Sequence, residues 1–210
     1  MAAPLREEAP LSVGILLFDQ VEELDAIGPY ETFKVASFHA ADHAARERPA
    51  LTVFTVAEHA DLIRTSGGLR IQPDYSFADA PAIDILVIPG GNVEPHLTNP
   101  ATLEWLGHVT ADARINSSVC TGAFFLATLG LLDHRSATTH WGALDELASR
   151  FPTTSVRREV RWVDEGPVVT SAGISAGIDM SLHLVERLFG RAAAEETARM
   201  MEYRWDERAD

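Results

Sequence analysis

The chain has 210 residues, of which 46% are hydrophobic and 23% charged, and it contains a single cysteine. These values are typical of one globular domain, and one cysteine excludes both a disulfide framework and a zinc site built from several thiolates. The formal net charge of −14 argues against nucleic-acid binding. No apolar segment reaches the roughly 20 residues of a membrane-spanning helix. We therefore expect a cytoplasmic protein that binds neither nucleic acid nor a membrane.

Apolar runs of strand length alternate with helical patterns along the chain, which is typical of an α/β domain with a mainly parallel sheet. Several of these runs have apolar residues on both faces, as expected for strands that helices cover on both sides. The predicted strands are 12–18, 51–56, 83–88, 115–119 and 168–171. The expected fold class is therefore α/β, with a doubly wound sheet and helices on both faces.

Helices are predicted between these strands and after the last one. Pro29 suits a first helical position, and the helix that it opens is expected to run to about residue 40. Apolar spacing predicts further helices at 98–113, 124–132, 178–189 and 191–203. Residues 42–49 are expected to form a loop, and 66–68 the tip of a hairpin before 69–72. We expect a tail at 1–10, a single domain at 11–203 and an acidic tail at 204–210.

The most informative segment is 116–123, where a predicted strand ends at Cys120 and small residues follow at once. An apolar helical run comes next, and the combination predicts a nucleophile elbow that projects the Cys120 side chain from the carboxyl edge of the sheet. The start of a helix stabilises a thiolate, so we expect Cys120 to be nucleophilic near neutral pH. The alternative is a small buried core residue, as free cysteines often are.

Two further segments are predicted to lie at the same edge. Gly90 and Gly91 follow a strand, and their backbone N–H groups could form an oxyanion hole, although two such glycines are also common as a simple turn. Asp25 follows the first strand, where a desolvated carboxyl could exchange a proton with a cysteine. The alternative for Asp25 is a helix cap.

The remaining candidates are less specific. His140 follows a short β-like stretch and could activate the thiol, whereas a core histidine bonded to the backbone is an equal alternative. The other histidines are scattered and predict no metal site. The pocket wall is expected from His96, Phe124 and Trp141, with core packing as the alternative, and Asp179 is expected to be structural.

Four segments in the order 88–91, 119–122, 137–141 and 170–173 resemble those of the ThiJ/PfpI superfamily, which has a flavodoxin-like, class I glutamine-amidotransferase-like fold. Segments 66–69 and 74–77 also match, so the resemblance covers the chain from residue 12 to about 203. Within the superfamily, the chain most resembles the isocyanide hydratases and the sensor-like domains of AraC-type regulators.

The resemblance implies a homodimer with a cysteine nucleophile, here Cys120, and a carboxylic acid after the first strand, here Asp25. Most of the superfamily has glutamate at the latter position, and isocyanide hydratases have aspartate. The implied reaction on a small-molecule isocyanide forms a thioimidate on Cys120, which water releases as an N-formamide with the help of Asp25 and Thr121. No metal or organic cofactor is implied, because sulfur provides the covalent route.

Two other functions remain open. Glyoxalase-like chemistry would use the same thiol on a small 2-oxoaldehyde, although the relatives with that activity usually combine glutamate with Cys-His or Cys-Ala. A ligand or redox sensor would use Cys120 without turnover. Peptidase activity is not expected, because Thr121 stands where the intracellular-protease branch has histidine.

Overall fold

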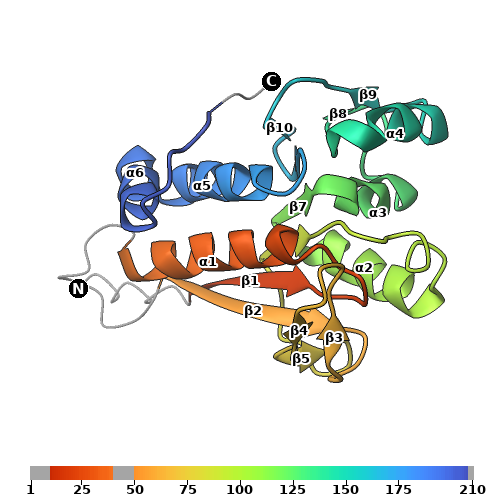
Figure 1. Ribbon diagram of the computed structural model, residues 1–210, viewed down its shortest axis with the longest axis horizontal. Coiled ribbons are helices and arrows are strands. Elements are labelled where there is room, and N and C mark those ends of the chain that lie inside the picture. Colours follow the sequence, from red (N-terminus) through yellow and green to blue (C-terminus); the bar gives the residue numbers. More distant parts are fainter. Residues whose placement is uncertain (1–9, 40–49, 208–210) are drawn as a thin grey trace, which may run out of the picture.

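The computed structural model describes residues 10–39 and 50–207, and its centre is a sheet of seven strands (Figure 1). The strand order is β10-β11-β7-β6-β1-β2-β5, parallel throughout except for β10, which pairs antiparallel with β11. The strands are β1 (Leu11–Leu16), β2 (Leu51–Ala57), β5 (Tyr75–Ser76), β6 (Ile85–Ile88), β7 (Ile115–Val119), β10 (Trp162–Asp164) and β11 (Val168–Ser171). The five predicted strands are β1, β2, β6, β7 and β11, which confirms the mainly parallel α/β fold.

Helices cover both faces of this sheet. Three helices pack together on one face: α1 (Glu23–His39), α5 (Ala176–Phe189) and α6 (Arg191–Met200). Right-handed crossovers between the parallel strands put α2 (Pro100–Asp112) and α3 (Ala123–Thr128) on the other. In the described part of the chain, no helix has the length and apolar character needed to cross a bilayer.

Short elements complete the fold around this core. The predicted hairpin is present as β3 (Ile63–Arg64) and β4 (Arg70–Ile71), which pair antiparallel around residues 66–68. Strands β8 (Ser136–Ala137) and β9 (Ser155–Val156) pair in parallel, and between them lie the 3-10 turn η2 (Trp141–Ala143) and helix α4 (Leu144–Arg150). The turn η1 (Cys120–Gly122) joins β7 to α3.

Helix α1 begins six residues before the position that the sequence predicts. Pro29 lies inside the helix, where its missing N–H leaves the Asp25 carbonyl without an i+4 donor, and the first turn is instead marked by the acidic Glu23 and Asp25. The early start carries Asp25 out of the loop and into the first turn. The other predicted helices are present. Helix α3 stops at Thr128 and α6 at Met200, before their predicted ends, whereas α5 begins two residues earlier than predicted. The predicted loop 42–49 lies outside the described residues, as does the predicted N-terminal tail except for residue 10.

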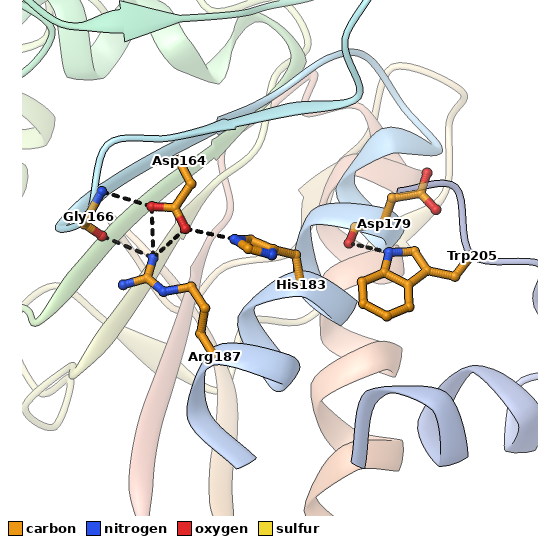
Figure 2. Close-up of polar contacts among 6 residues, drawn as sticks. All are labelled: Asp164, Gly166, Asp179, His183, Arg187 and Trp205. Carbon is orange, nitrogen blue, oxygen red and sulfur yellow. Dashed lines mark hydrogen bonds and ion pairs between the residues drawn. The ribbon is translucent and has the colours of Figure 1, made fainter. Parts of the chain in front are cut away.

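The C-terminal segment is tied to helix α5. Trp205 donates its indole N–H to the Asp179 carbonyl at 3.2 Å (Figure 2), and the backbone N–H of Asp206 donates to Asp179 Oδ1 at 2.9 Å. Glu207 pairs with Arg191 at the start of α6. Residues 205–207, predicted as part of a tail, therefore lie against the body of the domain.

Candidate active site

The loops after β1, β6 and β7 meet at the carboxyl edge of the sheet. Val21 forms an isolated bridge with Gly91, and the backbone N–H of Glu22 donates to the Gly90 carbonyl at 2.8 Å. These bonds fasten the start of α1 to the loop after β6. Asp25 is thereby brought beside the turn that carries Cys120.

The turn at Cys120 has the geometry of a nucleophile elbow, as the sequence predicts. Cys120 has a left-handed backbone with φ of 58°, which is uncommon for a residue with a Cβ and typical of strained functional turns. Gly122 is required by close approach, because a Cβ there would lie 2.1 Å from the Ile88 carbonyl oxygen. The Thr139 hydroxyl donates to the Cys120 carbonyl at 2.6 Å and the Cys120 N–H donates to the Ala172 carbonyl at 3.2 Å, so the elbow is held from two sides.

Asp25 is fully buried and has no cationic partner among the groups that shift its pKa. Its Oδ2 accepts a hydrogen bond from the Gly90 N–H at 2.9 Å, whereas Oδ1 has no hydrogen-bond partner among the described residues. The pKa of Asp25 is raised to about 7, mainly by burial and less by the negative charge of Glu22, while the Gly90 N–H, the Cys120 side chain and the Ile174 backbone act in the opposite direction. This carboxyl can therefore hold or release a proton near neutral pH.

Cys120 is buried beside this carboxyl, with 7% of its surface exposed. Burial raises the pKa of the Cys120 thiol to about 12, and the negative charge of Asp25 adds to the increase. The expected effect of the helix start is present, because the Thr121 N–H lowers the thiol pKa, but burial and the carboxylate outweigh it. With a thiol pKa of about 12 beside a carboxyl pKa of about 7, we expect Cys120 to become nucleophilic by giving its proton to Asp25, and its nucleophilicity near neutral pH stays a prediction.

Thr121 and the two glycines form a hydrogen-bonded unit next to this pair. The Gly91 N–H donates to Thr121 Oγ1 at 3.0 Å, and the same hydroxyl donates to the Gly91 carbonyl at 3.1 Å. Gly90 lies so close to the elbow that a Cβ would be 2.6 Å from the Thr121 nitrogen. Both N–H groups of the predicted oxyanion hole are therefore engaged within the site, where they hold Asp25 and Thr121 in place.

A cleft of about 270 Å³ opens beside Thr121 and Gly91. Its outer wall contains Glu94, Glu146 and Arg150, and the Arg150 Nη1 lies 2.5 Å from Glu94 Oε1 and 3.0 Å from Glu146 Oε1. The sequence analysis missed this ion-pair cluster. Glu146 and Arg150 are four apart on one helix, a visible signal, but nothing in the sequence brings Glu94 to them.

The other predicted residues are spread around the site. Phe124 lines the cleft, with the Arg150 guanidinium 5.1 Å from its ring centre. His140 accepts a hydrogen bond from the Gly142 N–H through Nδ1 at 3.2 Å, and its ring lies against Gly173, so it caps η2. Trp141 is 80% exposed. The His96 ring packs at a tilt against Phe18, with Nε2 3.1 Å from the Asp19 carbonyl oxygen.

Asp179 lies on α5, and its carboxylate is paired with Arg161, as expected of a structural residue. Within the described ranges, no three His, Cys, Asp or Glu side chains are grouped as a metal site would require.

Comparison with known proteins gives consistent matches over most of the chain. The family model described as "DJ-1/PfpI family" matches residues 11–187. An isonitrile hydratase of Pseudomonas putida is 36% identical over 194 residues, which cover 92% of this chain and 78% of that protein. The transcriptional regulator GbdR of Pseudomonas aeruginosa is 29% identical over 203 residues, 95% of this chain but 53% of the regulator. A crystal structure of a ThiJ/PfpI family protein from Pseudomonas syringae superimposes with a TM-score of 0.81 at 26% identity, covering 98% of this chain and 83% of that one.

Proposed function

The chain belongs to the DJ-1/PfpI family, and we propose that within this family it is an isocyanide hydratase that converts an isocyanide and water into an N-formamide. The observation that carries the proposal is the buried pair of Cys120 and Asp25, in which a nucleophile and a proton carrier adjoin without a histidine between them. Hydration of an isocyanide needs this combination, because sulfur must attack the terminal carbon and the same carbon must receive a proton. The 36% identity to an isonitrile hydratase supports the proposal.

In the first step, the thiol proton of Cys120 passes to the Asp25 carboxylate as sulfur bonds to the terminal carbon of the isocyanide. The lone pair on that carbon then takes the proton from Asp25, so that S–H has added across one carbon atom. The product is a thioimidate in which the carbon carries one hydrogen and is doubly bonded to nitrogen. The raised pKa of Asp25, about 7, suits both halves of this transfer.

In the second step, water attacks the thioimidate carbon while Asp25 accepts one of its protons. Thr121 is placed to orient this water: its hydroxyl hydrogen and one lone pair are used by Gly91, which leaves the second lone pair for a water O–H. Asp25 passes this proton to nitrogen, and it then takes the second proton of the water from the new hydroxyl as the carbon–oxygen double bond forms and the carbon–sulfur bond breaks. Sulfur regains its proton from Asp25. The N-formamide leaves, and the pair returns to its starting state.

The engaged backbone N–H groups favour this reaction over addition to a 2-oxoaldehyde. Attack on an aldehyde places negative charge on oxygen, which needs free donors, whereas the Gly90 and Gly91 N–H groups already bond Asp25 and Thr121. Attack on an isocyanide places the electron pair on carbon, where the Asp25 proton neutralises it.

Other expectations stay part of the proposal. We propose a cytoplasmic homodimer that acts on a small molecule and uses no cofactor. The regulators that this chain resembles are about twice its length, and DNA binding is not proposed for it.

The proposal is tested by incubating the purified protein with n-butyl isocyanide and following the formamide proton by NMR. We expect catalytic turnover by the wild type and none above background by Cys120→Ala or Cys120→Ser. Methylglyoxal is offered in parallel, with lactate as the readout. Equal rates for wild type and Cys120→Ala on the isocyanide would overturn the hydratase assignment, and Cys120-dependent lactate formation would favour the glyoxalase-like alternative.

A further inference from the structure

The cleft beside Thr121 adjoins the reacting pair through Thr121, and we infer that the substituent of a bound substrate extends into it, an inference that rests on the proposed function. An isocyanide is linear from its terminal carbon through nitrogen to the first carbon of the substituent. When the terminal carbon contacts the Cys120 sulfur, the rest of the molecule leads straight away from it. Thr121 directly follows Cys120, and with Gly91 it lines the cleft, whose volume of about 270 Å³ suits a substituent of several heavy atoms.

Charge on the outer wall of this cleft is unequal. Glu94 and Glu146 contribute two carboxylates and Arg150 one guanidinium, so the cluster carries a net charge of −1. Both ion pairs use the same Nη1 of Arg150. The guanidinium also packs over the Phe124 ring, so it is already in contact with three side chains of the protein. The Glu94 and Glu146 side chains are 60% and 56% exposed, so their carboxylates can contact a ligand as well as Arg150.

The reacting pair next to Thr121 lies outside the residues that line the cleft, and its charge adds to that of the cluster. Asp25 and Cys120 together carry one negative charge whenever they share a single proton, and the Glu22 carboxylate lies close enough to act on Asp25. A cationic substituent in the cleft would therefore be attracted by the cluster and by the neighbouring pair, and an anionic one repelled.

We propose that Glu94, Glu146 and Arg150 are the specificity-determining residues of this site and that they select isocyanides whose substituent is cationic over those whose substituent is anionic. Because the carboxylates are more than half exposed, solvent screens them, and we expect a preference of about tenfold rather than a strict requirement.

The test uses three probes of matched size: 3-isocyanopropyl-trimethylammonium, its neutral isostere 4,4-dimethylpentyl isocyanide, and 4-isocyanobutanoate. The quantity compared is the cation-to-anion ratio of kcat/KM, which does not depend on the fraction of folded enzyme in a preparation. In the wild type we expect a ratio of about 10 at low salt that falls toward 1 in 0.5 M NaCl.

The variants change the cleft charge in opposite directions. The double variant Glu94→Gln/Glu146→Gln is expected to lower the ratio about tenfold, and Arg150→Met to raise it severalfold. Asp112→Asn is the control for a change of charge away from the cleft, because it removes one carboxylate charge, half the change of the double variant, from an exposed residue at the end of α2, at the amino edge of the sheet. A wild-type ratio near 1, or cleft variants that shift it no more than Asp112→Asn, would overturn the inference while leaving the hydratase proposal intact. Failure of the wild type to hydrate even the neutral probe would overturn the proposed function and this inference with it.

Discussion

Two aspartates among the described residues, Asp25 and Asp179, are completely buried, and their surroundings are opposite in charge pairing and hydrogen bonding. Asp179 on α5 has the Arg161 guanidinium against Oδ2, through Nε at 2.8 Å and through Nη2, while Oδ1 accepts the Asp206 N–H. Asp25 on α1 has no cation, and one of its oxygens lacks a hydrogen-bond partner among the described residues. The first carboxylate is satisfied on both oxygens, whereas the second is left with a raised pKa of about 7.

The difference shows how this fold separates structure from chemistry. A buried charge is tolerated when it is paired and hydrogen-bonded, and such pairs hold elements together, as Asp179 holds the segment of Trp205 to α5 (Figure 2). An unpaired buried carboxyl costs stability, and its presence at the mouth of a parallel sheet is typical of a functional site. Substitutions at the two positions should therefore have opposite consequences.

The largest expected effect is on catalysis by Asp25→Asn. The amide keeps the shape of the side chain but cannot carry a proton between Cys120 and substrate, so kcat/KM for n-butyl isocyanide should fall about 10³-fold. The matched variant Asp179→Asn, at the other buried aspartate, should lose less than tenfold when rates are expressed per folded molecule. Similar losses in the two variants would contradict the assignment of Asp25 as the proton carrier.

The next effect is on the pH dependence of stability. Between its ordinary pKa of 3.8 and its folded value of about 7, Asp25 holds a proton in the folded state that the unfolded chain has released, so its contribution to stability falls as the pH rises through this range. Above pH 7 the carboxyl is ionised in both states and this decline ends. Asp25→Asn lacks the effect, and its free energy of unfolding relative to wild type should improve by about 4 kcal/mol from pH 4 to pH 8. Urea unfolding at four pH values measures it, and parallel curves would refute the raised pKa.

The third effect is a loss of stability in Asp179→Asn. Neutralising this carboxylate leaves the Arg161 guanidinium, which is 20% exposed, without its countercharge, and the free energy of unfolding should drop by about 3 kcal/mol. Adding Arg161→Gln should recover part of the loss, because the unpaired charge is then removed. Urea unfolding of the two single variants and the double variant gives the coupling. If the loss of unfolding free energy in the double variant equals the sum of the losses in the two single variants, Asp179 and Arg161 are not coupled.

The sheet and the elbow could be predicted from the sequence, because both depend on local patterns. Strands β7 and β11 have the predicted bounds, and the small residues around Cys120 indicate the sharp turn. The predicted start of α1 was wrong because Pro29 has a strong preference for the first turn of a helix. The contacts that hold the earlier first turn, such as the bridge between Val21 and Gly91, join segments 70 residues apart and are not visible in the local sequence.

Protonation could not be predicted in the same way. The expectation of a thiolate used only the helix start beside Cys120, a local effect, while the larger effects are burial and the charge of Asp25, which exist only once β1, β6 and β7 are assembled. The cleft cluster shows the same limit, since Glu94 follows β6 and Arg150 ends α4. Residue types at a site are thus more predictable than their ionisation.

The smallest of these effects concerns the water that completes the reaction, and it tests whether the neighbours of Asp25 act in catalysis or only in packing. Thr121→Val keeps the shape of the side chain but removes the hydroxyl that holds Gly91 and offers a lone pair to water, so kcat should fall about tenfold. Because sulfur attack does not use that hydroxyl, the Cys120 thioimidate should accumulate and be visible by mass spectrometry as the protein plus one substrate mass. Thr121→Ser retains the hydroxyl and should stay within about threefold of wild type without accumulating adduct. A slow Thr121→Val enzyme that contains no adduct would mean that the substitution disturbs the Asp25–Cys120 pair itself, and Thr121 would then be a packing residue.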